Sequence, residues 1–316
     1  MAPRLIISAD GPEAYAGWRD SFAQHAPEID VVSWFDTQTP REEAQYALVW
    51  EADDHDLRAM HHMRGILCTG AGVNHLVSSP DFPHHVPLVR MGGGDTGTLM
   101  ADYVLWACMT LLRDARTWAL QQERHVWARN LVSRTSASTH VTVLGYGQIG
   151  SVVAQRLARA GFQVTAWRRA SGETRDGEVR LLGGEEGFAS ALAGTDLLVN
   201  LLPSTPQTRQ ILNRGSLSLL KRGAGLINVG RGDHLVEADL LALLEAGHLA
   251  GAVLDVVAQE PLSPVSPLWD HPAITLTPHV ASEASREAQV RYLAQSIAQL
   301  ERGEMPALLF DHRRGY

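Results

Sequence analysis

Short apolar runs alternate with longer stretches of helical periodicity in the first part of the chain. The runs are "RLIIS" from Arg4, "DVVSW" from Asp30, "YALVW" from Tyr46 and "GILCTG" from Gly65. Each run has the length and the β-branched content of a strand, and each intervening stretch is long enough for a helix. Strands that alternate with helices predict a parallel sheet with helices packed on it.

A second series of the same kind begins at His140. Its apolar runs are "HVTVL", "QVTAW", "DLLVNLLP", "AGLINVG", "GAVLDVV" and "AITLTPH". Between the two series, Thr98 to Asp114 is almost continuously apolar, which predicts a buried helix with Asp95 or Thr96 near its start. Gly92, Gly93 and Gly94 precede this helix and permit unusual backbone angles, so we place a domain boundary there.

The last helical stretch, about residues 285–301, follows the second series and is expected to return to the first domain. We therefore predict an α/β protein with two doubly wound parallel-sheet domains. The smaller, discontinuous domain consists of residues 1–94 and 285–316, and a domain of residues 95–284 is inserted into it. A length of 316 residues suits two domains of ordinary size.

Composition and charge narrow the classes of function. Hydrophobic residues make up 45% of the chain and charged residues 20%, as in folded globular proteins. The formal charge of −8 gives no basic face for nucleic acid, so we expect no such partner. No apolar run approaches the roughly 18 residues needed to cross a bilayer, and the start "MAPRLIISAD" has the pattern of a strand and turn. We expect a cytoplasmic protein without a membrane partner.

Cysteine and histidine usage indicates neither a disulfide framework nor a metal centre. Cys68 and Cys108 are the two cysteines, too few for a framework and without CxxC spacing, which agrees with a reducing compartment. The pairs in "MHHM" at Met60 and "PHHV" at Pro83 lack further ligands at suitable spacing. We predict no functional metal.

The segment "VTVLGYGQIGSVVAQRLARAG" joins a strand-like run to a helix-like run through a GxGxxG turn. Gly145 permits the tight turn, Gly147 allows a pyrophosphate to approach the backbone, and Gly150 allows the helix to pack closely on the strand. Amides and the dipole at the helix start favour phosphate. In this context the motif predicts a Rossmann-like dinucleotide site, whose residues are Gly145, Tyr146, Gly147, Gln148, Ile149 and Gly150.

Arg168 and Arg169 directly follow the next strand, "QVTAW". At this position NAD-binding proteins commonly place an acid on the ribose 2′-hydroxyl. Arginine can bind a 2′-phosphate through charge-assisted, often bidentate hydrogen bonds. The two arginines therefore predict a preference for NADPH over NADH, with NADH still possible. The alternative is that both are solvated loop residues.

Three late segments carry residues suited to acid–base chemistry: "LINVGRGDHL" with Arg231, "AVLDVVAQEPL" with Asp255 and Glu260, and "ITLTPHVAS" with His279. Arginine suits a carboxylate or an adjacent carbonyl, and histidine, with a reference pKa near 6.5, can supply a proton. A neighbouring glutamate would stabilise the imidazolium.

With these segments in place, the sequence resembles the D-isomer-specific 2-hydroxyacid dehydrogenases, and most closely the glyoxylate/hydroxypyruvate reductase A type. The similarity runs essentially from end to end. It includes "LVW" at Leu48, "TGAGVNHL" at Thr69, the dinucleotide turn, "LVNLLPSTPQT" at Leu198, "SPLWDHP" at Ser266 and the closing "RRGY". The resemblance implies Arg231, Glu260 and His279 as the catalytic set, in a cleft between the domains that closure shields from water.

The resemblance also implies roles for residues outside that set. The amides of Ala71, Gly72 and Val73 match the family's carboxylate cradle, a nest of donors after a strand, although an ordinary glycine turn would look alike. Trp50 and Trp127 match substrate-side positions, of which Trp50 could equally be core. The implied cofactor contacts are Asp255, on the nicotinamide carboxamide, and Met100, Leu202, Pro203 and Val229, of which Met100 could simply pack its helix.

Residues 116–130, within an arm of about 113–135, resemble the family's dimerisation arm, with Trp118 and Trp127 as apolar anchors. The resemblance thus implies a homodimer. Two departures from the family are Val257, where an aromatic residue is frequent, and Gly230, where alanine is common. Neither removes a catalytic group, but Val257 leaves the size of the substrate open.

The sequence therefore predicts a reductase of glyoxylate, hydroxypyruvate or a similar small 2-oxo acid. A reductase of larger 2-oxo acids of the phenylpyruvate kind remains open, because a pocket discriminates by only about 1 to 3 kcal/mol per methylene. The alternative from another class is a dinucleotide-sensing binding protein like the corepressors that share this fold, which the compact chain disfavours. Formate dehydrogenase is disfavoured because such enzymes use glutamine where this chain has Glu260.

Overall fold

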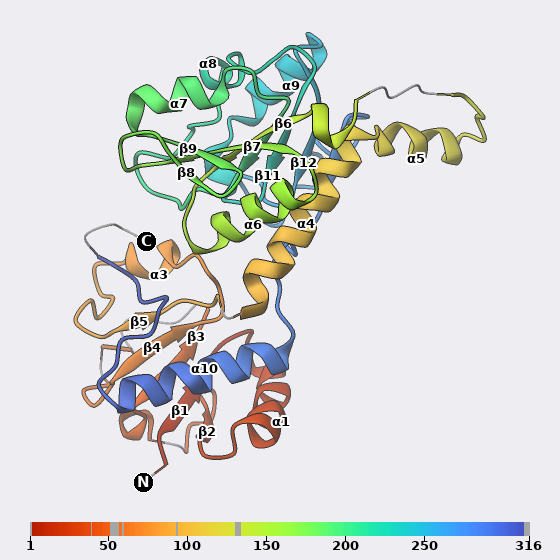
Figure 1. The fold of residues 1–316 in the computed structure, drawn as a ribbon. Coiled ribbons are helices and arrows are strands. Elements are labelled where there is room, and N and C mark those ends of the chain that lie inside the picture. Colours follow the sequence, from red (N-terminus) through yellow and green to blue (C-terminus); the bar gives the residue numbers. More distant parts are fainter. Residues whose placement is uncertain are drawn as a thin grey trace. The chain divides into compact units, whose positions relative to one another are not determined.

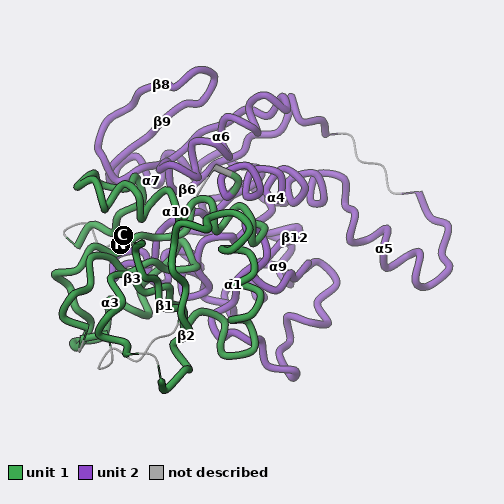
Figure 2. Tube along the Cα trace, turned by 90° about the horizontal axis from the view of Figure 1, so that it is seen from below, with its two compact units in different colours: residues 1–95, 284–316 green, residues 96–283 purple. Residues whose placement is uncertain are grey.

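The structure, a computed structural model, describes residues 2–38, 40–50, 57–58, 60–92, 94–129 and 134–312. Gly93, the end of the predicted arm at residues 130–133 and the closing "RRGY" lie outside the described residues. The chain divides into two compact units (Figure 2). Unit 1 comprises Met1–Asp95 and Ala284–Tyr316, and unit 2 comprises Thr96–Glu283.

Unit 1 is built on a five-stranded parallel sheet in the order β2-β1-β3-β4-β5 (Figure 1). The strands are β1 (Arg4–Ile7), β2 (Asp30–Ser33), β3 (Tyr46–Val49), β4 (Gly65–Cys68) and β5 (Leu88–Val89). Its helices are α1 (Tyr15–His25), α3 (Asn74–Val77) and α10 (Arg286–Glu301), with the short 3-10 turns η1 (Pro12–Ala14) and η2 (Arg41–Glu43). This strand order is that of the flavodoxin-like doubly wound fold.

Successive side chains of a strand point to opposite faces of the sheet, and in this sheet a hydrophobic core lies on each face. Leu5 and Ile7 pack with Trp18 of α1 and Leu293 of α10 in one core. Ile6, between them in sequence, packs in the second core, on the other face. Parallel strands covered on both faces read as continuous apolar runs, which is why the sequence revealed them.

Unit 2 is built on an eight-stranded sheet in the order β13-β12-β11-β10-β6-β7-β9-β8. The strands are β6 (His140–Leu144), β7 (Gln163–Arg168), β8 (Thr174–Asp176), β9 (Val179–Gly183), β10 (Leu197–Asn200), β11 (Ala224–Asn228), β12 (Leu249–Leu254) and β13 (Ile274–Leu276). All neighbours pair in parallel except β8 and β9. From β9 to β12 the order is that of the Rossmann fold, and the predicted fold class is confirmed.

The helices of unit 2 are α4 (Gly94–Leu112), α5 (Ala115–Glu123), α6 (Gln148–Arg159), α7 (Gly184–Leu192), α8 (Arg214–Leu217) and α9 (Glu237–Glu245), with 3-10 turns η3 (Ser136–Ser138) and η4 (Gly232–His234). The unit boundary falls in the first turn of α4. Val104 of α4 and Val153 of α6 belong to one core, and Leu192 of α7 and Leu240 of α9 belong to the other. The sheet thus separates two apolar layers.

The prediction that residues 98–114 form a buried helix is wrong for one face. Leu99, Trp106 and Met109 are 36%, 44% and 41% exposed. The spacing of these residues places them on one side of α4, opposite buried Val104 and Cys108. A continuous apolar run therefore conceals two different faces, one in the core of unit 2 and one open to solvent.

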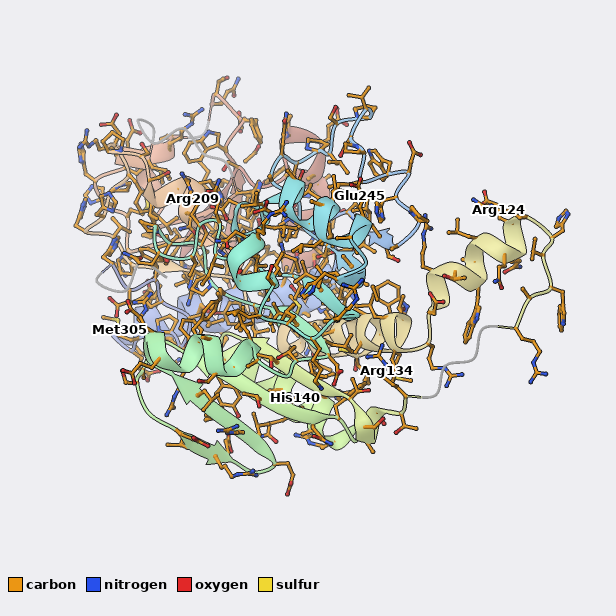
Figure 3. The ribbon with its side chains drawn as sticks, turned by 90° about the horizontal axis from the view of Figure 1, so that it is seen from above. Arg124, Arg134, His140, Arg209, Glu245 and Met305 are labelled. Carbon is orange, nitrogen blue, oxygen red and sulfur yellow. The ribbon has the colours of Figure 1, made fainter. Side chains whose placement is uncertain are left out.

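Helix α5 extends away from the sheet of unit 2 (Figures 1 and 3). None of its residues is buried. Trp118 is 38% exposed, and Trp127, beyond the helix and beyond Arg124, is 99% exposed. Residues 115–129 therefore form an arm that places large apolar side chains in solvent.

Candidate active site

The glycine-rich turn lies between β6 and α6, which begins at Gln148 with Gly147 as its N-cap residue. Gly145 has a φ of 101°, which favours glycine. A Cβ at Gly150 would lie 2.0 Å from the carbonyl oxygen of Gly145, so the contact between helix and turn requires a glycine there. A Cβ at Gly147, by contrast, would meet nothing within 4 Å. The chain itself does not require Gly147, and the open space beside it fits a phosphate.

The turn also lies where an open α/β sheet binds its ligand. Strand β6 lies between β7 and β10. The chain runs outward from β6 through β7 to β9 on one side and then returns to β10 on the other. Ligands of such folds bind at the carboxyl ends of the strands at this reversal. The backbone amides of Gln148 and Ile149 stand at the start of α6, where anions are favoured.

Arg168 is the last residue of β7 and is half-buried, whereas Arg169 is exposed. The Nη2 of Arg168 donates a 3.1 Å hydrogen bond to Oγ1 of Thr174. Its Nε is buried and has no hydrogen-bond partner within the described part of the chain. An acceptor brought by a ligand would satisfy this donor, so the residues present fit a dinucleotide with a 2′-phosphate.

The other predicted cofactor contacts lie deep in unit 2. Met100 and Val229 are 6% and 5% exposed and belong to the core that includes α4 and α6. Leu202 is 6% exposed and belongs to the opposite core. The carbonyl of Pro203 accepts a 2.7 Å hydrogen bond from Oγ1 of Thr208, which fixes the loop after β10. For Met100, packing of its helix accounts for its position.

A buried polar network supports this loop and the segment that carries Arg231. The Nδ2 of Asn200 donates to Oδ1 of Asn228 at 2.8 Å and to Nδ1 of His234 at 2.9 Å. Asn228 in turn donates from Nδ2 to the carbonyl oxygen of Arg231 at 3.2 Å. All three network side chains are fully buried. A Cβ at Gly230 would lie 2.8 Å from Nδ2 of Asn200, so the glycine at this position makes room for the network.

Burial lowers the pKa of His234, against an opposing effect of Asp233. Because its Nδ1 accepts from an amide, the neutral imidazole carries its proton on Nε2. The network therefore contains a neutral histidine, which the sequence did not reveal. The signal that was available is its place three residues after Arg231.

His279 and Glu260 form the pair that the sequence predicted. Nδ1 of His279 lies 2.7 Å from Oε2 of Glu260. An ionised carboxylate only accepts hydrogen bonds, so the proton is on Nδ1, and Nε2 is the atom that can exchange a proton with a substrate. The side chains of His279 and Glu260 are 42% and 39% exposed, so neither member of the pair is buried.

The electrostatics of the pair keep Glu260 ionised. Partial burial raises the pKa of its carboxyl group. The hydrogen bond from His279, the hydrogen bond from the amide of Val257 and the positive charges of His279 and Arg231 outweigh this effect, and the pKa is lowered overall. Arg231 is thus close enough to Glu260 for its charge to lower the pKa of the carboxyl group. Nη1 of Arg231 donates a 2.7 Å hydrogen bond to the carbonyl of Gly230.

Asp255, at the end of β12, holds the loop on which His279 stands. Its carboxylate accepts hydrogen bonds from Oγ1 of Thr277 at 2.6 Å and from the amides of Val280 at 2.9 Å and Ala281 at 3.0 Å. The amide of His279 donates to the carbonyl of Asp255 at 2.9 Å. These bonds fix His279 although its φ of 58° is uncommon for a residue with a Cβ. A carboxylate has about four acceptor positions, so one remains for a further donor.

Two residues that the sequence did not single out extend this arrangement. The hydroxyl of Tyr103, on α4, lies 2.5 Å from Oγ1 of Thr277. Because Thr277 donates to Asp255, it accepts from Tyr103, and burial raises the pKa of this tyrosine to about 12. Thr277 stood within the quoted "ITLTPHVAS", but nothing in the pattern of α4 distinguished Tyr103 from its apolar neighbours.

Unit 1 holds the predicted carboxylate cradle and Trp50. Among the described residues, none accepts a hydrogen bond from the amides of Ala71, Gly72 or Val73. These three amides follow β4 and precede α3, as a nest of donors would. The ring of Trp50 packs on the ring of His75 with centroids 4.3 Å apart, and Nε2 of His75 lies 2.6 Å from the carbonyl oxygen of Trp50.

Within the described ranges, no three histidine, cysteine, aspartate or glutamate side chains gather as metal ligands would. No helix in these ranges is long and apolar enough to span a membrane. Cys68 and Cys108 are both free and buried. Trp127 stands in solvent on the arm of unit 2, away from any contact that would assign it a role in this chain alone.

A Rossmann-type domain with an open phosphate turn, and on the same sheet a histidine paired with a carboxylate beside an arginine, defines a nicotinamide-dependent dehydrogenase. Comparison with known families agrees. Residues 105–281 match the NAD-binding domain of the D-isomer specific 2-hydroxyacid dehydrogenases. The chain belongs to the D-isomer specific 2-hydroxyacid dehydrogenase family.

Individual relatives match over almost the whole chain. Glyoxylate/hydroxypyruvate reductase A of Yersinia enterocolitica is 36% identical over 95% of this chain and 96% of its own. The protein of the same name from Serratia proteamaculans is 37% identical over the same shares.

Solved structures of related proteins are similar to this chain over almost its whole length. A D-isomer specific 2-hydroxyacid dehydrogenase from Xanthobacter autotrophicus Py2, in complex with NADPH, has a TM-score of 0.92 at 34% identity, with both chains fully covered. An NADPH-dependent glyoxylate/hydroxypyruvate reductase from Sinorhizobium meliloti, in complex with NADP and sulfate, has a TM-score of 0.89 at 34% identity. That match covers 99% of this chain and 100% of the other.

Proposed function

We propose that this dehydrogenase reduces small 2-oxo acids, glyoxylate and hydroxypyruvate among them, to 2-hydroxy acids with NADPH. The observation that carries the proposal is the 2.7 Å hydrogen bond between Nδ1 of His279 and Glu260, in the field of Arg231. The relatives support this choice of substrates, since they are named as reductases of glyoxylate and hydroxypyruvate.

The cofactor that the residues fit is NADPH. The open space at Gly147 and the start of α6 would hold the pyrophosphate, and Arg168 would bind the 2′-phosphate, joined by Arg169. Relatives bound to NADPH or NADP support this preference. The bound cofactor supplies the hydride for the carbonyl carbon of the substrate. The fourth acceptor position of Asp255 would receive the carboxamide.

His279 supplies the proton. In its doubly protonated form, Nδ1–H is held by Glu260 and Nε2–H faces the substrate's carbonyl oxygen. Proton transfer from Nε2 leaves a neutral imidazole, still oriented by the same hydrogen bond. The ionised carboxylate of Glu260 stabilises the imidazolium before transfer.

Two groups would bind the substrate's carboxylate. Arg231 presents a planar fork that matches a carboxylate or a carbonyl beside it. The amides of Ala71, Gly72 and Val73 would supply further donors from unit 1, which we propose as the substrate domain, with unit 2 as the cofactor domain. Trp50, held by His75, would limit the size of the substrate, and Trp127 would act across a homodimer. The two buried free thiols favour a cytoplasmic setting.

The test is a set of initial rates of cofactor oxidation with glyoxylate and hydroxypyruvate, each with NADPH and with NADH. We expect turnover with both acids and a large advantage for NADPH. Turnover with phenylpyruvate alone would move the substrate to larger 2-oxo acids. Tight NADPH binding without turnover of any 2-oxo acid would contradict the proposal and favour a dinucleotide-sensing binding protein.

A further inference from the structure

The β8–β9 hairpin lies beside the dinucleotide turn, at a position that the sequence did not reveal. Strand β9 pairs in parallel with β7, so that Gly183 stands opposite Arg168. Strand β8 then folds back on β9, with Asp176 opposite Val179. The connection from β7 passes so close to β9 that a Cβ at Gly183 would lie 1.7 Å from the carbonyl oxygen of Ala170. The path of the chain after Arg168 is therefore closely determined.

One face of β8 points to the dinucleotide turn. Residues 174 and 176 of a strand share a face, and residue 175 points to the other. The hydroxyl of Tyr146, inside the glycine-rich turn, donates a 2.7 Å hydrogen bond to Oδ2 of Asp176. Gln155 of α6 donates to the carbonyl oxygen of Asp176 at 2.9 Å. These bonds tie the hairpin to both the turn and the helix that follows it.

Thr174 faces Arg168 on this same side. Its Oγ1 accepts the 3.1 Å hydrogen bond from Nη2 of Arg168. The pKa of Tyr146 is raised by burial and by Asp176, and the charge of Arg168 opposes this shift, so the guanidinium also lies near the turn. Arg168 therefore bonds Thr174 and lies near Tyr146, with its buried Nε still without a partner among the described residues.

We propose that Thr174 binds the 2′-phosphate of NADPH together with Arg168. The β8–β9 hairpin then contributes to the phosphate site beside the glycine-rich turn and the end of β7. This inference rests on the proposed preference for NADPH. A hydroxyl that accepts from a guanidinium has its own hydrogen to donate, and a phosphate oxygen is the strongest acceptor a cofactor would bring to this place. Thr174 thus both orients Arg168 and contacts the ligand that Arg168 binds.

The test compares Thr174→Val with Thr174→Ser, which keeps the hydroxyl. Equilibrium binding of NADPH, NADH, 2′,5′-ADP and 5′-AMP is measured for each variant. We expect Thr174→Val to weaken NADPH and 2′,5′-ADP by about ten-fold and to leave NADH and 5′-AMP unchanged. Thr174→Ser should stay within about two-fold of the parent protein for all four ligands. Thr174 lies on an exposed strand, so its substitution should not change the melting temperature.

Two further variants separate this inference from the function on which it rests. Arg175→Ala removes a charge from the opposite face of β8 and should leave the ratio of NADPH to NADH affinity unchanged. Arg168→Ala should reduce that ratio.

If Arg168→Ala reduces the ratio of NADPH to NADH affinity and Thr174→Val does not, the hairpin inference is wrong and the NADPH preference stands. If the parent protein binds NADPH and NADH equally and Arg168→Ala changes neither, the NADPH preference itself is wrong. Equal losses of both cofactors in Thr174→Val would also overturn the inference.

Discussion

His279 is placed for proton transfer by two carboxylates that have separate tasks. Glu260 bonds the imidazole itself, whereas the carboxylate of Asp255 accepts hydrogen bonds from the side chain of Thr277 before it and from two backbone amides after it. Loss of the imidazole should therefore remove the acid and leave the loop in place. We expect His279→Ala to lower kcat by about 10² to 10⁴-fold. NADPH binding, measured by fluorescence titration, should stay nearly unchanged. Turnover at the parent rate would show that another group supplies the proton.

Glu260 should set the acid end of the pH range of the reaction. Its lowered pKa means that the carboxylate persists to a pH below the usual range of glutamate, so protonation of Glu260 should limit the rate only in that acid range. Because Glu260→Gln removes the carboxyl group that titrates there, the acid limb of kcat/KM should be absent from the pH profile of this variant. An acid limb at the parent position in Glu260→Gln would mean that another group produces it.

The glycine-rich turn contains one glycine that the fold requires and another that only the cofactor requires. Gly147 has ordinary backbone angles and open space around it, whereas Gly150 touches the carbonyl of Gly145. We expect Gly147→Ala to keep the melting temperature and to weaken NADPH by at least about ten-fold. Gly150→Ala should lower the free energy of unfolding by about 1 to 3 kcal/mol, since overpacking shifts the helix. Equal melting temperatures of the two variants would contradict this assignment.

Sequence patterns could predict some elements of the fold and not others. Buried parallel strands, such as Leu197–Asn200, were predictable because both of their faces are apolar. The exposed strand Thr174–Asp176 has no apolar face, and the Asp176-Gly177 turn signal was its one available sign. The roles at the site came from resemblance. The carboxylate of Asp255 accepts three hydrogen bonds from the His279 loop. These bonds join residues far apart in the sequence, so no local pattern could predict them.

The buried His234 links the stability of the whole folded chain to pH. The folded chain holds this histidine neutral at a lowered pKa, whereas the unfolded chain takes up a proton near the reference value of 6.5. The unfolded state thus binds more protons below about pH 6.5, and stability falls as the pH drops through that value. Thermal melting between pH 8 and pH 5.5 should show this fall, and His234→Asn, which keeps an acceptor near Nδ1, should reduce it. His125→Asn, at an exposed histidine, should leave the slope unchanged.

A single copy of the chain leaves large apolar side chains uncovered. Leu99, Trp106 and Met109 form an exposed apolar stripe on α4, and Trp118 and Trp127 are exposed on the arm that follows it. Stable monomers rarely expose so many large apolar side chains on connected elements, and aromatic residues on an arm are typical anchors of an interface. We therefore expect sedimentation equilibrium at micromolar concentration to give the mass of a dimer.

Substitution should localise that dimer interface. If the arm anchors the dimer, Trp127→Asp should raise the dimer dissociation constant by at least about ten-fold, because a charge would replace an apolar anchor. Met305→Asp changes a side chain that is 71% exposed but lies outside the arm, and it should leave association unchanged. Should the parent chain sediment as a monomer, the exposed arm would need another partner. Should both variants weaken the dimer equally, the interface would lie elsewhere than the arm.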